Sequence, residues 1–118
     1  METTFKMENK YITMVRGDTL SFGVEIIDEN GDRISQKLDT VILTCKSNKS
    51  ADENLFQKTL GDGVEERDGG LYAVRVAPED TANAEPGKYF YDLEIGVNGD
   101  IFTIMHGVLE IVQDVTER

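Results

Sequence analysis

Apolar and polar residues alternate with a period of two along most of this chain, and that period predicts β-strands. The pattern is clearest in five stretches, which we expect to form strands: 20–26, 40–46, 72–76, 89–97 and 100–112. A shorter strand is expected within 54–60. Strands with this alternation bury one face against a core and leave the other face in solvent.

Turn residues separate the expected strands. Asn30-Gly31 and Asn98-Gly99 are the strongest signals, because Asn-Gly favours the tight turn of a β-hairpin. Further glycine turns are expected at 61–63 and 68–70. Helical tendency is limited to one short turn near 78–84, which begins with a proline followed by two acidic residues. About seven short strands with almost no helix predict an all-β sandwich.

The last expected strand is unusual because both of its faces are apolar. A β-bulge at Gly107 is expected to shift the side-chain alternation. On that basis the core face carries Phe102, Ile104, Leu109 and Ile111. The outer face then carries Ile101, Met105, Val108 and Val112, and Phe90 of the preceding strand lies beside it. An apolar outer face of this kind is covered either by the N-terminal segment around Phe5 and Met7 or by another subunit.

Length and charge limit the classes of function. The 118 residues correspond to a single domain, with 1–10 as an N-terminal arm. The chain has 23 acidic and 12 basic side chains, a net charge of −11, which disfavours binding to nucleic acid or to an anionic membrane. No apolar run is long enough to span a membrane, and the N-terminal residues lack the apolar stretch of a signal peptide. Cys45 is the single cysteine, which favours a reducing cytoplasm.

The sequence offers no convincing catalytic or metal site. His106 is the only histidine and lies within an expected strand, where a structural role is the common one. Cys45 lies on an apolar face, where we expect a buried and inert thiol. One cysteine and one histidine do not suffice for zinc, and there is no phosphate-binding loop or dinucleotide fingerprint. We therefore expect no enzyme activity, cofactor or metal.

Two short motifs have simple structural explanations. The acidic stretch Asp28–Asp32 has oxygen ligands at alternate positions, but Arg33 stands where a calcium loop of the EF-hand type needs glycine. We interpret this stretch as a hairpin turn. Arg16–Asp18 spells the Arg-Gly-Asp tripeptide of integrin ligands, and a turn between two strands accounts for it.

The segment 85–91 resembles the entry to the sixth strand of immunoglobulin-like domains. In those domains a corner tyrosine ties its hydroxyl to the backbone of the preceding turn. The resemblance gives that role to Tyr89. The usual cysteine two positions later is Tyr91, and there is no tryptophan. The resemblance thus implies a sandwich held by apolar packing rather than an antibody-type domain.

Three segments taken together resemble small immunoglobulin-like proteins of phages and prophages, similar to the N-terminal domain of the phage baseplate upper protein. They are RGDTLSFGVEIIDENGD, GGLYAVRVAPEDT, and PGKYFYDLEI followed by HGVLEIVQDVT. The resemblance implies a non-enzymatic structural or adaptor protein of a baseplate, neck, tail or decoration layer. Such a protein would be present in the bacterial cytoplasm during assembly and in the virion afterwards.

The expected mode of action is self-association and docking to other phage structural proteins, as a homo-oligomer. The expected interface consists of five apolar residues: Phe90, Ile101, Met105, Val108 and Val112. The alternative is a module that binds carbohydrate or another surface ligand, with Tyr11, Tyr72 and Phe90 stacking on sugar rings. The absence of tryptophan weighs against that alternative.

Overall fold

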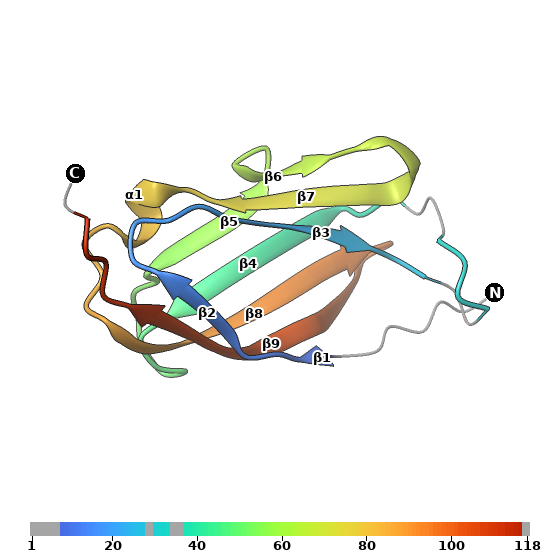
Figure 1. Ribbon diagram of the computed structural model, residues 1–118. Helices are drawn as coiled ribbons and strands as arrows, with labels where there is room; N and C mark the ends of the chain where they lie inside the picture. The colour runs from blue at the N-terminus through green and yellow to red at the C-terminus, as the bar shows by residue number, and fades with distance from the viewer. Residues whose placement is uncertain (1–7, 28–29, 34–36, 117–118) are drawn as a thin grey trace.

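Strands account for nearly all of the regular structure (Figure 1). The computed structural model describes residues 8–27, 30–33 and 37–116. In these residues the strands are β1 (Glu8–Asn9), β2 (Ile12–Val15), β3 (Leu20–Glu25), β4 (Thr40–Lys46), β5 (Phe56–Leu60), β6 (Gly63–Glu66), β7 (Leu71–Val76), β8 (Gly87–Val97) and β9 (Asp100–Val112). The helical pieces are η1, a 3₁₀ turn at Asp68–Gly70, and α1, one α-helical turn at Pro78–Thr81.

The strands form two packed layers. In the larger layer β4 pairs with β8 and β8 with β9, all antiparallel, and β1 and β2 add to the edge of β9 in parallel. In the smaller layer β7 lies between β3 and β6. β5 pairs with β4 and, at its end, with β6, so it connects the layers. This pairing is that of an immunoglobulin-like β-sandwich, and the expected fold class is confirmed.

β6 is a strand that the alternation of apolar residues did not predict. It is four residues long, and only Val64 in it is buried. It begins at Gly63, whose φ is +98°, in a segment with the glycines and aspartate typical of a turn. A strand with one buried side chain carries almost no period-two signal.

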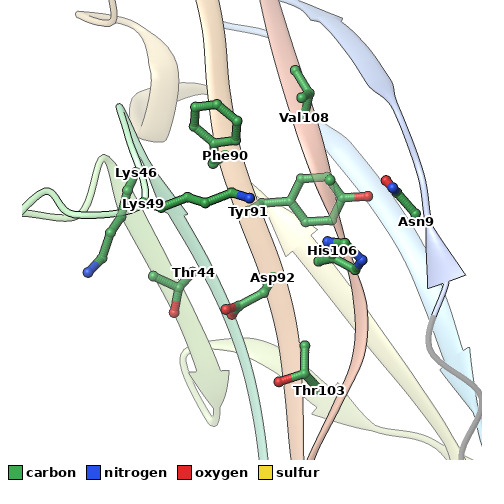
Figure 2. A pocket seen from close by; sticks show the side chains of 11 residues that line it. Asn9, Thr44, Lys46, Lys49, Phe90, Tyr91, Asp92, Thr103, His106 and Val108 are labelled. Carbon is green, nitrogen blue, oxygen red and sulfur yellow. The ribbon is translucent and has the colours of Figure 1, made fainter.

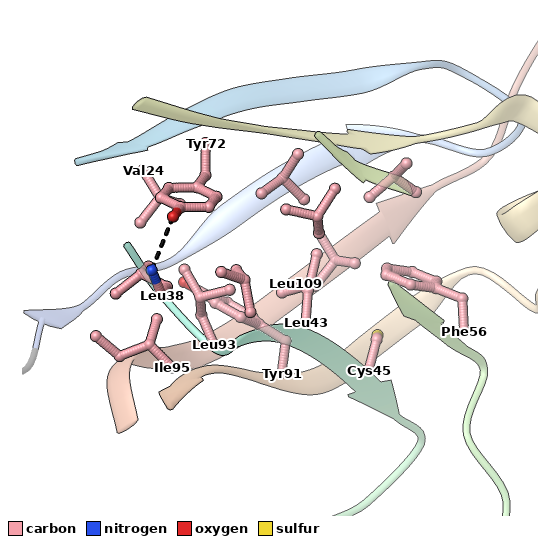
Figure 3. Close-up of a cluster of buried hydrophobic side chains, with 14 of the residues drawn as sticks. Val24, Leu38, Leu43, Cys45, Phe56, Tyr72, Tyr91, Leu93, Ile95 and Leu109 are labelled. Atoms are coloured by element: carbon pink, nitrogen blue, oxygen red, sulfur yellow. Dashed lines mark hydrogen bonds between the residues drawn. The ribbon is translucent and has the colours of Figure 1, made fainter. Parts of the chain in front are cut away.

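The core lies between the two layers, and each strand predicted from alternation contributes to it. The buried side chains include Val24, Val41, Leu43, Cys45, Tyr72, Val74, Val76, Leu93, Ile95, Leu109 and Ile111. Figure 3 shows several of these side chains, among them Leu43, Tyr72 and Leu109, between the two layers. Within the described residues, every buried side-chain nitrogen or oxygen has a hydrogen-bond partner.

Tyr72 belongs to this core and is only 1 % exposed. Its hydroxyl accepts a hydrogen bond from the backbone N–H of Leu38 at 2.8 Å (Figure 3) and donates one to Glu66 at 3.3 Å. The suggestion that Tyr72 stacks on a sugar ring is therefore wrong.

The hairpin between β8 and β9 forms where Asn98-Gly99 predicted it. Both residues have positive φ, +52° and +86°, as the tight hairpin turn requires. The turn thereby sets the register in which Val97 lies opposite Asp100 and Ile95 opposite Phe102.

The β-bulge lies at Ile104, and its expected position at Gly107 is wrong. Leu93 is opposite Met105, and the next residue, Glu94, is opposite Thr103, so Ile104 is the extra residue. Because the alternation shifts there, Met105 lies on the inner face and packs against the core. The placement of Met105 at an outer interface is thus also wrong.

Glycine is needed at position 107 for a different reason: the backbone of the N-terminal segment lies directly against it. Lys10 and Tyr11 separate β1 from β2, and the backbone N–H of Lys10 donates to the His106 carbonyl at 2.9 Å. Tyr91 donates its hydroxyl hydrogen bond to the Lys10 carbonyl at 2.6 Å. A Cβ atom on Gly107 would overlap that same carbonyl. The described part of the arm thus runs along the edge of β9, while Phe5 and Met7 lie outside the described residues.

Candidate functional site

The outer face of the larger layer contains a shallow, open depression of about 420 Å³. It extends across β4, β8, β9 and β1, with the loop after β4 at one side (Figure 2). The lining residues are Asn9, Thr44, Lys46, Lys49, Phe90, Tyr91, Asp92, Thr103, His106, Gly107 and Val108. The face combines apolar, cationic and hydrogen-bonding groups, which makes it the best candidate for a binding site.

One row across the sheet is apolar with a cationic end. Phe90 of β8 lies opposite Val108 of β9 on one side and opposite Lys46 of β4 on the other. The ammonium nitrogen of Lys49 lies over the Phe90 ring, 5.6 Å from its centroid. Figure 2 shows the Lys49 side chain reaching toward that ring. This cation–π contact places the positive charge of Lys49 beside the apolar pair.

The neighbouring row is polar throughout. The strand register places Thr44 opposite Asp92, Asp92 opposite His106 and His106 opposite Asn9. Thr44 Oγ1 accepts a hydrogen bond from Gln57 Nε2 at 3.0 Å. These side chains can donate to and accept from an extended ligand that lies across the strands.

This row does not have the order of a catalytic triad. In a triad the imidazole stands between the nucleophile and the acid. Here Asp92 stands between Thr44 and His106.

In the described part of the chain no group of three or more His, Cys, Asp or Glu side chains could hold a metal ion. Asp28 and Glu29 of the acidic turn lie outside the described residues.

The residues of the expected interface do not form one continuous patch. Phe90 and Val108 are adjacent and lie in the depression. Ile101 lies near the hairpin tip and is 60 % exposed. Val112 lies opposite Val15 of β2 at the other end of β9. Met105 is directed to the core. The other four residues lie at three separate places on the outer face: the Phe90–Val108 pair, Ile101 and Val112.

Tyr89 makes the contact that the resemblance to immunoglobulin-like domains implies. Its hydroxyl donates a hydrogen bond to the Glu85 carbonyl, four residues upstream, at 2.8 Å. The contact ties the turn after α1 to the start of β8. Burial raises the pKa of the Tyr89 hydroxyl.

The Arg-Gly-Asp segment forms the turn between β2 and β3. Gly17 has a φ of +81°, and its N–H donates to the buried hydroxyl of Thr81 at 2.8 Å. Arg16 pairs with Asp114 at 2.9 Å and donates to the Ala84 carbonyl at 3.3 Å. These contacts hold the segment against the end of the sandwich, as expected of a structural turn.

Cys45 is fully buried, and burial raises the pKa of its thiol from 9.0 to about 12. The unfolded chain therefore releases the thiol proton at lower pH than the folded chain. We expect the free energy of unfolding of the wild type to fall with pH above 9, relative to Cys45→Ala, by up to about 1.4 kcal/mol per pH unit. Urea unfolding of both proteins between roughly pH 8 and 10.5 measures this difference. Parallel pH dependences for the two proteins would contradict it.

Sequence reasoning missed the polar and cationic part of the depression. Thr44, Lys46 and Asp92 are the outward neighbours of the buried residues in β4 and β8. Because they alternate with buried residues along their strands, the sequence pattern does place these three residues on an outer face. Asn9 and Lys49 come from β1 and from a loop, and only the folded arrangement brings them to that face.

No helix in the described residues has the length and hydropathy needed to cross a membrane.

Comparison with known proteins identifies the fold and no family. No protein-family model matches the chain, and no curated protein matches it. Among solved structures, an endo-β-1,4-mannanase from Thermotoga petrophila is similar, with a TM-score of 0.57 and 12 % identity over 97 % of this chain. The N-terminal Ig1-2 module of the Drosophila receptor protein tyrosine phosphatase DLAR matches with a TM-score of 0.46 and 16 % identity over 99 % of this chain.

This chain covers 20 % of the mannanase and 51 % of the DLAR module. At 12 % identity the likeness to the mannanase shows the fold alone. The resemblance to phage proteins stays a prediction.

Proposed function

We propose that this protein is a non-enzymatic structural or adaptor protein of a phage or prophage, which acts by docking to copies of itself and to other structural proteins. The single observation that carries the proposal is the outer face of the β4–β8–β9 sheet. There an adjacent apolar pair, Phe90 and Val108, is bordered by two lysines and by a row of hydrogen-bonding side chains. An apolar centre with a polar border is the usual composition of a protein–protein contact.

The rest of the molecule fits an adaptor. The packed core and the hydrogen-bonded N-terminal strand make a stiff platform for the outer face. A net charge of −11 favours solubility of the subunit before assembly, in the bacterial cytoplasm, where the proposal places it until it enters the virion. This placement rests on the resemblance of the sequence to phage proteins.

Carbohydrate binding has less support, because the expected stacking residues are not available. Tyr72 is buried, and the ammonium group of Lys49 lies over the Phe90 ring. Tyr11 is exposed, but its hydroxyl donates to Glu110 at 2.7 Å at the edge of the sheet. A sugar needs an open aromatic face, and none of the three offers one together with the polar row.

The proposal predicts that the chain is a component of phage particles. Particles induced from a strain that carries the gene are purified on a density gradient and analysed by quantitative mass spectrometry. We expect the chain in a fixed ratio to the major capsid or tail protein. An abundant cytoplasmic protein serves as the control for contamination. Absence of the chain from pure particles that contain the other structural proteins would contradict a place in the virion.

A further inference from the structure

The outward side chains of β8 change from basic to acidic along the strand. Lys88, Phe90, Asp92 and Glu94 alternate with the core residues of β8, so they point to the outer face of the larger layer. Lys88 and Asp92 are exposed, and Glu94 is partly exposed. The strand thus presents a lysine, a phenylalanine and two carboxylates in that order.

Two further lysines lie at the basic end of this face. Lys46 of β4 is opposite Phe90, and the ammonium group of Lys49 lies over the Phe90 ring (Figure 2). Together with Lys88 they form what we call the basic end. On β9 this end also holds one carboxylate, Glu110, which is opposite Lys88. The basic end therefore keeps an excess of positive charge on a chain whose net charge is −11.

Asp92 and Glu94 form the acidic end, and the strand register places no lysine or arginine of β4 or β9 beside them. Their cross-strand neighbours are Ile42, Thr44, Thr103 and His106. Lys88 is six residues away from Glu94 on the same strand, a separation of about 20 Å, which a lysine side chain cannot bridge. Lys88 and Glu94 can therefore pair only between two molecules.

We propose that two copies stack their outer faces on each other about a two-fold axis, with the two β8 strands antiparallel. The axis runs across the strands, midway between the rows of Phe90 and Asp92. Lys88 of each copy then faces Glu94 of the other, and Lys49 faces Asp92. This inference rests on the proposed function and names the surface of the second copy as the same outer face.

Electrostatics selects this arrangement among the symmetric ways to stack two such faces. Parallel β8 strands place the basic end of one copy on the basic end of the other. An axis through the row of Phe90 places Lys46 on Lys46, and an axis through the row of Asp92 places two carboxylates together. Like charges in contact weaken association. Only the register midway between the two rows pairs opposite charges along β8.

The dimensions of the face suit a specific but modest contact. β8 has 11 residues, so the face is about 36 Å long, and β4, β8, β9 and the β1–β2 edge together span about 19 Å. Full overlap buries on the order of 1,300 Å² over the two copies, within the range of specific contacts. Water can fill the shallow depressions between the polar rows. Because both copies use the same face, the assembly closes as a dimer.

Charge reversal of the pair that is too distant to meet within one copy tests this contact. Lys88→Glu places a carboxylate opposite Glu94 of the second copy, and Glu94→Lys places an ammonium group opposite its Lys88. Each variant introduces this repulsion twice, because the contact is two-fold symmetric. We expect each to weaken dimerisation at least about tenfold, measured by analytical ultracentrifugation at low ionic strength.

Two combinations restore opposite charges. In an equimolar mixture of Lys88→Glu and Glu94→Lys, the mixed dimer has an attractive pair at both positions. The double variant Lys88→Glu/Glu94→Lys restores both pairs in its own dimer. We expect the mixture and the double variant to dimerise within about threefold of the wild type. The rescue cannot come from within one copy, because the two residues are too far apart along β8.

Matched variants control for the change in charge itself. Arg75→Glu reverses an exposed cation on β7, in the other layer, and Glu79→Lys reverses an exposed acid on α1. We expect both to dimerise as the wild type does. Circular dichroism melting shows whether each variant is folded. If Lys88→Glu is unfolded, Lys49→Glu takes its place, because it puts a carboxylate opposite Asp92 of the second copy.

The outcomes separate this contact from the proposed function. A wild type that is monomeric at every concentration, or folded charge-reversed variants that dimerise normally, would overturn the contact. So would a mixture and a double variant that fail to regain dimerisation. Presence of the chain in purified particles together with any of these results would leave the structural role standing. Regained dimerisation, with the chain absent from particles, would support the contact and remove the virion component.

Discussion

Met105→Asp is expected to destabilise the protein by at least about 3 kcal/mol, whereas Val108→Asp leaves it folded with a change below about 1 kcal/mol. Met105 lies opposite Leu93 on the inner face and packs against the core. An aspartate there loses apolar packing and brings a carboxylate into an apolar environment. Val108 is directed to the outer depression, where a carboxylate keeps its water.

Urea unfolding followed by circular dichroism measures both variants, and each serves as the control for the other. The contrast depends on the position of the β-bulge. With the bulge at Ile104, Met105 is inward and Val108 outward. If Met105→Asp is tolerated as well as Val108→Asp, the alternation of β9 is not the one described.

Gly107→Ala is expected to lower the free energy of unfolding by about 2–3 kcal/mol and to loosen the N-terminal strand. The added Cβ overlaps the backbone of Lys10, which cannot move aside without breaking its hydrogen bonds to His106 and Tyr91. The backbone of Gly107 also has a φ of +156°, which side chains rarely adopt. We expect hydrogen exchange to become faster at the amides of β1 and β2, because their pairing with β9 is lost first.

Gly61→Ala is the matched control for this substitution. Gly61 has a φ of +87°, but a Cβ there meets nothing within 4 Å. It therefore reports the conformational penalty alone, about 1–2 kcal/mol, without a clash and without an effect on β1 and β2. Equal hydrogen-exchange rates at the amides of β1 and β2 in the two variants would contradict the claim that a side chain at position 107 disrupts their pairing with β9.

Most of the fold was predictable because the core side chains come from strands in which apolar and polar residues alternate. The strands at 20–25, 40–46, 71–76, 87–97 and 100–112 each have buried or partly buried apolar residues at alternate positions. The Asn98-Gly99 turn fixes the longest hairpin, because its two positive φ values suit those residues. Local sequence therefore carried the signal for both the strand and the turn.

The errors arose where a distant contact decides the structure. Gly107 suggested a bulge, but the reason for glycine there is the Lys10 backbone, 97 positions away in the sequence. The bulge at Ile104 needs no special residue, so nothing in the sequence indicates it. The inward direction of Met105 follows from that bulge and was missed with it.

The candidate site was predictable only in part. Phe90 and Val108 were expected on an outer face, and they are neighbours in the depression. Lys46 was visible as an outward residue of a predicted strand, yet its proximity to Phe90 depends on the register between β4 and β8. Lys49 comes from a loop, and its position over the Phe90 ring depends on the folded conformation of that loop. A site assembled from register and loops cannot be derived from alternation alone.

Native mass spectrometry of the wild type over a concentration series tests the central claim, that this protein acts by docking its outer sheet face to other protein copies. We expect oligomers to increase with concentration, and we expect Val108→Asp, shown to be folded by circular dichroism, to shift the distribution to monomer. Light scattering after size exclusion gives the same species in solution. A wild type that stays monomeric at all concentrations, or a Val108→Asp variant that assembles as the wild type does, would contradict it.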